Sequence, residues 1–514
     1  MYEYTSILEV MSSQSLHVSV AHPATRILVV FSIIKVNHIL QLVKEAFHDT
    51  VTGQRFGDML NFCPEIDRFL LARMHQTACQ CNLAGPDLDI YHCRVEWPLA
   101  QLTAHIPRDF RIFGCHLTSP ILFSICLFWY YTSMNDYRHT EFAPVTAQGV
   151  YLNHAGVAPT PARVMQAVKE ALDYAASNPL GFFIDRVLTV QESARKRLAR
   201  LMGVTPEHLA FTKNTGHGLA LVADALRLEP GDNVVSVDCE YPSVVYPWYA
   251  QAERGIETRL VTPRADGTFT PDDLDTVMDD KSRVLTLSWV QFGTGFRCDL
   301  AACAEMAHAR GALFVVDVIQ GLGALPLEAE KLGLDIVVTG AHKWLIAPGG
   351  TGGLYIAPPV LERMRLVNMG AMSVVDVPKF DPLDFSPKPD SRRYEEGTPN
   401  GLGLCGLDAA LSLLEEVGID AIATQVLSLT AYLADKLDQK GYRVSSPRAD
   451  SERGGLVMFQ HPTYSNESIL QTLTDAGVTA AVRGGKVRFS PHFYNTFAEM
   501  DIAVDALTIS TGAG

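Results

Sequence analysis

The chain of 514 residues is long enough for two or three domains, each with its own hydrophobic core. Hydrophobic residues make up 47% of it and charged residues 19%, which is typical of a folded globular protein and not of a disordered one. The net charge of -15 argues against a nucleic-acid partner, because the chain has no basic stripe to neutralise phosphates. Small molecules are therefore the expected ligands.

Residues 1–133 differ in composition from the rest of the chain. They hold six of the ten cysteines but only four of the 38 glycines. Their apolar stretches are shorter than the roughly 20 residues that span a bilayer, and no basic region suits a signal peptide. We predict an atypical, partly disordered extension with Met134 as an alternative start. A small membrane-associated appendage is the second interpretation, although no membrane partner is expected.

The cysteine spacing supports neither a metal site nor a disulfide framework. Cys79 and Cys81 form a lone C-x-C pair, and the other cysteines of the extension are irregularly spaced. We therefore expect no metal ion and a reducing, cytoplasmic compartment.

Apolar runs alternate with helix-period segments from about residue 140 onward. Buried strands are predicted over 209–212, 233–238, 283–290, 313–318 and 335–338. This alternation favours an α/β fold with a mostly parallel sheet and helices on both faces. After about residue 390 the pattern changes to two helices and short strands. We predict a large domain over 140–390, in which 140–180 also contributes to the small domain, and a small α+β domain over 391–514.

The strand at 209–212 leads through Thr215, Gly216 and His217 into a helix. Free backbone N–H groups at a helix start favour an anion such as phosphate. A short turn of this kind is more often an ordinary helix cap, so the signal is weak in isolation.

Asp317 ends the apolar strand LFVVD, and Gln320 follows in the next turn. A carboxylate at this position is costly unless it has a cationic or hydrogen-bonded partner. An aspartate that caps a strand–helix junction is the alternative interpretation.

Lys343 follows the strand at 335–338, so it lies at the carboxyl edge of the predicted sheet, where open α/β sheets bind ligands. Most lysines are solvated surface charges. In a cleft, however, desolvation and neighbouring cations lower the pKa of a lysine and make it a nucleophile for a carbonyl. With Asp317 it would supply an amine for a Schiff base and an acid that keeps a pyridine nitrogen protonated. These are the two demands of pyridoxal phosphate chemistry.

Seven segments in order, from about residue 150 to 507, resemble the class V aminotransferase family of fold-type I pyridoxal phosphate enzymes. The nearest branch in appearance contains isopenicillin N epimerase-like and cysteine desulfurase-like proteins. The segments are YLNHAGVAPTP, NTGHGLALVA, EYPSVVYPW, VVDVIQGLGALPL, TGAHKWLIAPGGTGGLYIA, RRYEEGTPNGLGLCGL and VRFSPHFYNT.

The resemblance implies pyridoxal 5'-phosphate as the cofactor and Lys343 as the Schiff-base lysine. It implies that Asp317 binds the pyridinium nitrogen, that Gln320 binds the phenolic oxygen and that Tyr241 stacks on the ring. Around the phosphate it implies Thr215, Gly216, His217 and His342.

For the substrate, the resemblance implies that Arg488 binds the α-carboxylate, with Arg483 as a weaker second candidate. Asn153 and His154 would lie near the substrate end of the pocket. An arginine on an edge strand is otherwise a surface charge, but a planar guanidinium suits a carboxylate because it donates two parallel hydrogen bonds.

The sequence departs from the desulfurase branch at two places. Relatives place a hydroxyl residue three positions before the lysine, where this chain has Gly340. Phosphate binding is then expected from Thr339, or from Ser373 of a neighbouring subunit in a homodimer. Relatives also carry a nucleophilic cysteine before the carboxylate-binding arginine, whereas this chain reads GGKV between Arg483 and Arg488. Persulfide-forming desulfuration is therefore disfavoured.

The leading hypothesis is an aminotransferase-like enzyme that acts at the Cα of an amino acid. Epimerase and lyase outcomes of the same fold remain open. A binding protein that keeps the fold without turnover is the alternative of another class.

Overall fold

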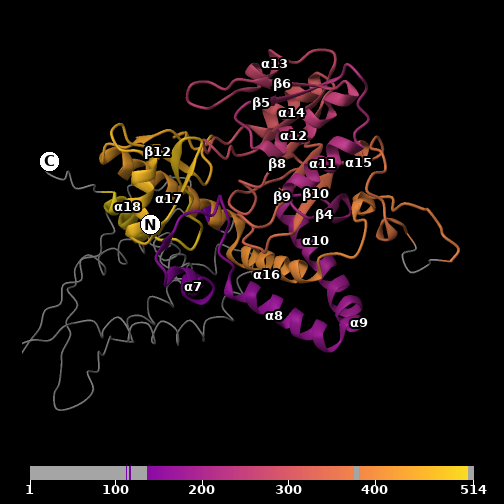
Figure 1. The fold of residues 1–514 in the computed structure, drawn as a ribbon, viewed down its shortest axis with the longest axis horizontal. Coiled ribbons are helices and arrows are strands. Elements are labelled where there is room, and N and C mark those ends of the chain that lie inside the picture. The colour runs from indigo at the N-terminus through magenta and orange to yellow at the C-terminus, as the bar shows by residue number, and fades with distance from the viewer. Residues whose placement is uncertain (1–110, 113–114, 117–135, 376–380, 508–514) are drawn as a thin grey trace, which may run out of the picture. The chain divides into compact units, whose positions relative to one another are not determined.

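The computed structural model describes residues 111–112, 115–116, 136–375 and 381–507 (Figure 1). The prediction for residues 1–133 lies outside the described residues, apart from a short pairing of β1 (Arg111–Ile112) with β2 (Cys115–His116). Among the helices of the described part, no single one is long and apolar enough to cross a membrane. The bent pair α16 (Gly401–Val417) and α17 (Ile419–Gln439) passes that test together by length and composition alone.

The larger sheet has seven strands in the order β4-β10-β9-β8-β7-β5-β6. Only β10 runs antiparallel to its neighbours, so the sheet is mostly parallel, as the alternation of strands and helices predicts. The strands are β4 (Leu209–Thr212), β5 (Asn233–Val237), β6 (Glu257–Val261), β7 (Ser282–Ser288), β8 (Leu313–Asp317), β9 (Ile336–Gly340) and β10 (Gly352–Ile356).

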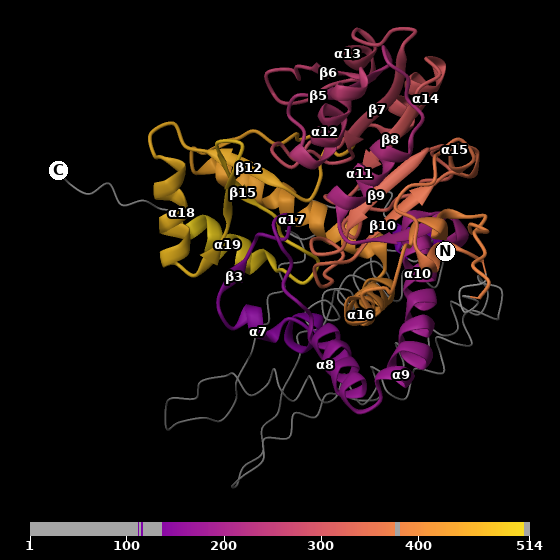
Figure 2. The ribbon, with the colours of Figure 1, turned by 45° about the vertical axis from the view of Figure 1, so that its right-hand side comes forward.

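Helices cover both faces of this sheet (Figures 1 and 2). The central strand β8 shows why. Phe314 and Val316 belong to one hydrophobic core and Val315 to the other, and all three are fully buried. A strand buried on both sides has no polar face, which explains its continuous apolar sequence. One face packs on α10 (Leu188–Met202), α14 (Leu300–Ala309) and α16, and the other on α11 (Thr215–Ala225), α12 (Pro242–Tyr249) and α15 (Pro358–Leu361).

A smaller antiparallel sheet has the order β11-β12-β15-β14. Val457, Phe459, Val487 and Phe489 on one of its faces form a core with the neighbouring helices. Its strands are β11 (Arg443–Val444), β12 (Val457–Gln460), β14 (Ala481–Arg483) and β15 (Lys486–Phe489), and the helices around it are α17, α18 (Asn466–Asp475) and α19 (Phe497–Ala506). Residues before the large sheet also reach this part, because β3 (Val150–Tyr151) pairs with β13 (Val478–Thr479).

The helix α16 packs against α8 (Ala162–Ser177) and α10, and its Leu404, Leu407 and Leu411 belong to a core of the larger sheet. The domain boundary at residue 391 stays a prediction, and this packing favours a later boundary. The remaining short segments are α7 (Ala143–Thr146), α9 (Pro179–Gly181), α13 (Pro271–Asp275), the π-helical turn Phe182–Val187 and the 3-10 turns Pro206–His208, Ala250–Arg254, Ala371–Ser373 and Ser391–Tyr394.

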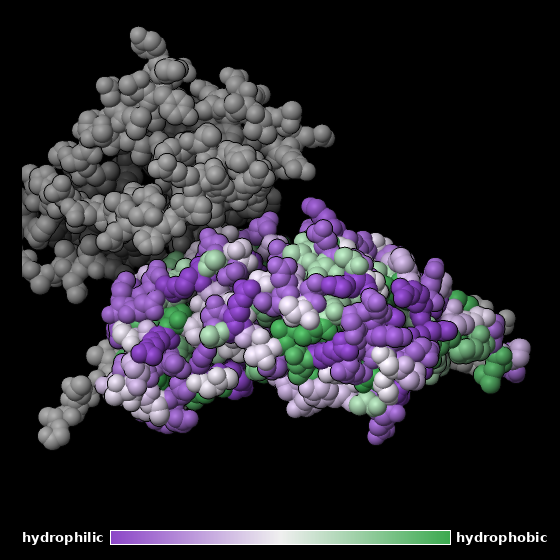
Figure 3. All heavy atoms as spheres, turned by 90° about the horizontal axis from the view of Figure 1, so that it is seen from above, coloured by the Kyte–Doolittle hydropathy of each residue, from purple (hydrophilic) through white to green (hydrophobic). Residues whose placement is uncertain are grey.

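Residues 381–386 project from the body of the protein (Figure 1). Figure 3 shows a largely hydrophilic face with hydrophobic residues near its centre and at its right-hand end. Leu383 and Phe385 in this projecting loop are 90% and 66% exposed. Large apolar side chains that project together are unusual on the surface of a monomer and mark a contact surface.

Candidate active site at the carboxyl edge of the larger sheet

Lys343 and Asp317 leave the same edge of the sheet. Asp317 is the last residue of β8 and pairs with Val338 of the parallel strand β9, which ends three residues before Lys343. Burial raises the pKa of Asp317 to about 7, although the charge of Lys343 acts in the opposite direction. Burial and, to a smaller extent, the charges of Arg488 and Arg483 lower the pKa of Lys343 to about 8, although the charge of Asp317 acts in the opposite direction. An amine with such a pKa is partly unprotonated near neutral pH and is a competent nucleophile.

Tyr241 lies beside this pair. It precedes helix α12, and its ring centroid is 5.5 Å from the Nζ atom of Lys343. The Tyr241 ring meets Phe292 edge-to-face at 5.3 Å and is 45% exposed, so it has free surface for a planar ligand. Its stacking role stays a prediction.

Glu240 is a residue of this site that the sequence interpretation missed. One of its oxygens accepts hydrogen bonds from the backbone N–H of Ser288 and the side-chain amide of Gln291, both at 2.6 Å. The other accepts from the Ser288 hydroxyl at 2.5 Å and from the backbone N–H of Tyr241 at 3.2 Å. Ser288 pairs with Asp317 across the parallel strands β7 and β8. Glu240 therefore fixes Tyr241 and the strand end next to Asp317 with one buried carboxylate.

The N-terminus of helix α11 lies next to Gly340. Asn214 caps the helix, because its Oδ1 accepts from the backbone N–H of His217 at 2.8 Å. The buried hydroxyl of Thr215 has no hydrogen-bond partner among the described residues. A Cβ atom at Gly340 would lie 3.1 Å from that hydroxyl oxygen. An unsatisfied hydroxyl at a helix start, kept clear by a glycine, fits a phosphate group.

The other predicted phosphate ligands divide into two groups. Gly216, in the first turn of α11, and the partly exposed His217 and His342 remain available there. Burial lowers the pKa of both histidines, so each is a neutral hydrogen-bonding group.

The hydroxyls of Thr339 and Ser373 are engaged within the chain. Thr339 is fully buried and its hydroxyl donates to the carbonyl of Gly340 at 3.2 Å. Ser373 is fully buried and its hydroxyl accepts from the backbone N–H of Gly370 at 3.1 Å. Their roles at a phosphate stay predictions, and these contacts would have to open for either residue to reach a ligand.

Gln320 is buried, and its amide is partly engaged. Its Oε1 accepts from the indole N–H of Trp344 at 3.0 Å, and its Nε2 donates to the carbonyl of Ala155 at 3.1 Å. One N–H of the amide group is left for a ligand, because an amide nitrogen carries two hydrogens.

His154 is fully engaged in the protein interior. Its Nδ1 lies 2.8 Å from the carbonyl of Ser490, and its Nε2 lies 2.9 Å from the hydroxyl of Tyr494. Burial and the neighbouring His492 keep its pKa well below the usual value, so the ring is neutral. Both nitrogens are occupied, which favours a structural role over the predicted contact with a substrate.

Arg488 is a buried cation with no carboxylate partner among the described residues, and only 1% of it is exposed. Its guanidinium donates to the carbonyl of Phe292 at 3.2 Å and to Oδ1 of Asn153 at 3.4 Å, while its Nε has no partner within the described part of the chain. Burial and the charge of Arg483 lower its pKa to about 10, so it stays charged at neutral pH. A buried, unpaired cation is costly, and a ligand carboxylate would remove that cost.

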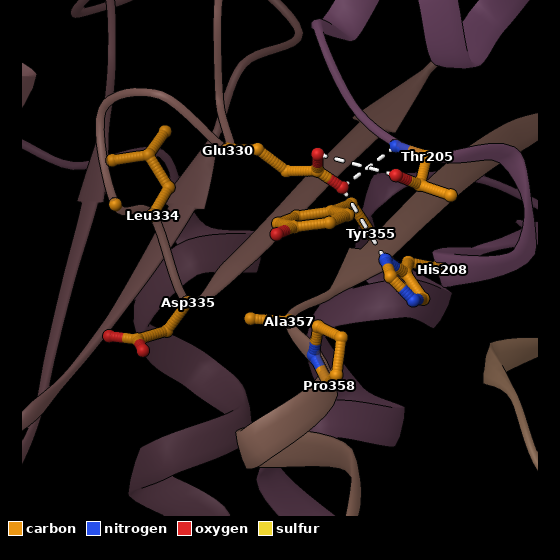
Figure 4. Close-up of a pocket in the computed structure, with 9 residues that line it drawn as sticks. Thr205, His208, Glu330, Leu334, Asp335, Tyr355, Ala357 and Pro358 are labelled. Atoms are coloured by element: carbon orange, nitrogen blue, oxygen red, sulfur yellow. Dashed lines mark hydrogen bonds and ion pairs between the residues drawn. The ribbon is translucent and has the colours of Figure 1, made fainter.

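A separate pocket of about 330 Å³ lies at the opposite edge of the sheet (Figure 4). Its two carboxylates are already paired. Glu330 accepts from the backbone N–H of Thr205 at 2.7 Å and lies 3.4 Å from Nδ1 of His208. Asp335, on its rim, lies 2.7 Å from Nε2 of His308. Within the described structure, the residues that line this pocket include none of the buried unsatisfied groups that mark the Lys343 edge.

Comparisons with known proteins show which sequences and which fold this chain resembles. The family model described as aminotransferase class-V matches residues 150–501. A probable cysteine desulfurase of Methanothermobacter thermautotrophicus is 28% identical over 400 residues, which cover 72% of this chain and 97% of the relative. Isopenicillin N epimerase of Streptomyces clavuligerus is 29% identical over 378 residues, or 71% and 95% of the two chains. The apo structure of a cysteine desulfurase from Thermococcus onnurineus NA1 matches with a TM-score of 0.66 at 25% identity, over 72% of this chain and 96% of that one.

Proposed function

The chain belongs to the class V aminotransferase family, and from that premise we propose that it is a pyridoxal 5'-phosphate enzyme acting at the Cα of an amino acid. One observation carries the proposal. The partly buried Lys343 and the buried Asp317 lie at the same sheet edge beside Arg488, a buried cation without a carboxylate partner among the described residues. The first pair suits the cofactor, and the arginine suits an amino-acid carboxylate.

The described residues fit the cofactor at each of its polar groups. The Thr215 hydroxyl and the start of helix α11 would hold the phosphate. Asp317 would bind the ring nitrogen, Gln320 the phenolic oxygen and Tyr241 the ring face. When bound, the cofactor supplies an electron-poor ring that accepts negative charge from Cα.

The protein's own part in the reaction follows from three side chains. Arg488 binds the substrate carboxylate and thereby fixes the direction of the Cα–H bond. The amine of Lys343, whose pKa is lowered to about 8, takes the proton from Cα. Asp317 holds a proton at the ring nitrogen, because a carboxylate there favours the charged form of the ring.

Transamination is the proposed outcome, and epimerisation is the second candidate. Desulfuration through a persulfide is disfavoured by the cysteines within the described ranges. Burial raises the pKa of the Cys239 thiol to about 12, and Cys298 and Cys303 are buried in a core. Cys405 lies inside helix α16 with a raised pKa. A reactive cysteine needs the thiolate form, which these surroundings oppose.

We also propose a homodimer. The projecting loop with Leu383 and Phe385 is an apolar surface of the kind that a second copy would cover. Light scattering would test this assembly, and a monomer that binds the cofactor fully would contradict it.

A panel of amino acids in heavy water tests the proposed activity. Exchange of the Cα hydrogen for deuterium measures proton removal, keto-acid formation measures transamination, and inversion measures epimerisation. We expect exchange together with keto acid and no sulfide from cysteine. Protein loaded with the cofactor that exchanges no Cα hydrogen would contradict the proposal and favour a binding protein without turnover.

A further inference from the structure

Three cations lie on one face of the smaller sheet. In the antiparallel pair β14–β15, Arg483 is opposite Lys486 and Ala481 is opposite Arg488. Residues directly opposite one another share a face, as do residues two positions apart on one strand. Arg483, Lys486 and Arg488 therefore project from the same face, the one opposite to the core residues Val487 and Phe489.

The face that carries these cations is turned toward Lys343. Arg488 on that face contacts the carbonyl of Phe292, and the Phe292 ring contacts Tyr241. The turn between the two strands lies beside the same loop, since a Cβ atom at Gly484 would be 3.6 Å from the carbonyl oxygen of Gly293. The charge of Arg483 acts on both Lys343 and Arg488. The cations thus run from the buried Arg488 to the rim of the site.

No carboxylate among the described residues forms an ion pair with these three cations. The described residues form many ion pairs, among them Arg197 with Glu415 and Arg310 with Asp275. In the same part of the chain, Arg483, Lys486 and Arg488 take part in none. In a protein with 57 acidic and 42 basic residues, three neighbouring cations without an acidic partner stand out. Such a cluster focuses a positive potential at the entrance.

We propose that Arg483 and Lys486 form a second anion subsite beside Arg488, so that the enzyme takes α-amino acids whose side chain ends in a carboxylate. The inference rests on the proposed function and specifies its substrate class. Alternate residues of a strand are about 7 Å apart. Arg488 would bind the α-carboxylate, and the two rim cations would bind an acid one side chain away.

L-Glutamate and L-glutamine test the inference, because they have nearly the same shape and differ in charge. Binding of each to the enzyme loaded with pyridoxal 5'-phosphate is measured from the change in cofactor absorbance. We expect glutamate to bind about fivefold more tightly than glutamine, as two partly exposed ion pairs would provide. The preference should shrink in high salt, because salt screens exposed charges.

The variant with both Arg483→Gln and Lys486→Gln should bring the two affinities together, because it should weaken the binding of glutamate more than that of glutamine. Glutamine binding that persists in the variant also shows that the variant is folded. Arg443→Gln is the matched control, since it removes an exposed cation at the far edge of the same sheet and should keep the preference. Equal affinities in the unmodified enzyme, or a preference that survives in the double variant, would overturn the inference alone. Absence of any response to either amino acid would contradict the proposed function as well.

Discussion

The two edges of the larger sheet hold similar residue types in opposite states. At the carboxyl edge, Asp317 is buried beside a lysine whose pKa is lowered, and Thr215 has an unpartnered hydroxyl within the described structure. At the other edge, Asp335 and Glu330 are matched by histidines and backbone N–H groups around an open pocket. The carboxylates at the hollow edge are paired, whereas the carboxyl edge holds buried groups that lack partners within the described structure. Unsatisfied buried groups, and not the size of a cavity, therefore locate the ligand site.

The largest expected effect is a loss of activity on substitution at the carboxyl edge of the sheet but not at the opposite edge. Lys343→Ala should lower turnover by about 10⁴-fold or more and remove the yellow colour of bound cofactor, because the lost amine both links the cofactor and moves the proton. Asp335→Asn at the opposite edge is the control and should keep both. The measurements are Cα exchange and absorbance. Normal turnover in the lysine variant would refute the assignment.

A second comparison sets Arg488 against Arg195, which is also buried but is paired with Glu395 at 2.6 Å. Arg488→Gln should raise the KM for amino acids about a hundredfold, because a desolvated ligand contact is lost. Its stability should be unchanged or higher, since no ion pair is broken. Arg195→Gln should instead lose about 3 kcal/mol of stability by leaving Glu395 buried without its partner. Steady-state kinetics measures the change in KM, and urea unfolding measures the change in stability. If both variants changed KM and stability to the same extent, Arg488 would not differ in role from Arg195.

Asp317→Asn should make the protein without cofactor more stable by about 2 kcal/mol at pH 8. The folded-state pKa of Asp317 is raised to about 7. Protonated Asp317 stabilises the folded state relative to the charged form. This contribution to the free energy of unfolding is fully present below about pH 4 and is lost as the pH rises through 7. Asparagine keeps the shape without the charge, so the difference should shrink toward pH 4. The same variant should exchange Cα hydrogens more slowly. Urea unfolding at both pH values measures the difference. A variant less stable than the unmodified protein at pH 8 would contradict the claim that burying the charged Asp317 side chain destabilises the fold.

The pH dependence of cofactor binding tests whether Lys343 differs from a solvated lysine at the protein surface. The folded-state pKa of Lys343 is lowered to about 8, so the free amine becomes abundant as the pH rises through 8. The rate at which added pyridoxal 5'-phosphate develops its bound absorbance should rise across that range and level off above it. Stopped-flow absorbance follows this rate. A rate that keeps rising toward pH 10.5 would indicate a solvated lysine.

The pattern of apolar residues predicts the larger sheet well, because β8 and β9 are buried on both faces and leave a continuous apolar signal. The strand ends then identify Asp317 and Lys343. Glu240 was missed because its role depends on Ser288 and Gln291, which lie about fifty residues away along the chain. The position of His154 near the substrate stays a prediction, and its contacts with Ser490 and Tyr494 could not be read from the sequence. Local sequence cannot reveal partners that only folding brings together.

The smallest expected effect concerns the space next to Thr215. Gly340→Ala would place a methyl group 3.1 Å from the Thr215 hydroxyl and 3.1 Å from the Ile319 side chain. That spacing is tight. We therefore expect the affinity for the cofactor to fall about tenfold with little change in fold, because the added methyl group would crowd the proposed phosphate site. Gly311→Ala, outside the site at a turn with positive φ, should reduce stability but not affinity. Equilibrium titration with the cofactor measures both, and unchanged affinity in the first variant would mean that the phosphate lies elsewhere.

Borohydride reduction tests the central claim most directly, because it fixes a Schiff base permanently to the lysine that forms it. The protein loaded with pyridoxal 5'-phosphate is reduced, digested and mapped by mass spectrometry. We expect a single modified peptide, with the cofactor on Lys343 at the edge whose buried groups lack partners within the described structure. Modification at another lysine, or no modification of protein saturated with cofactor, would contradict the account.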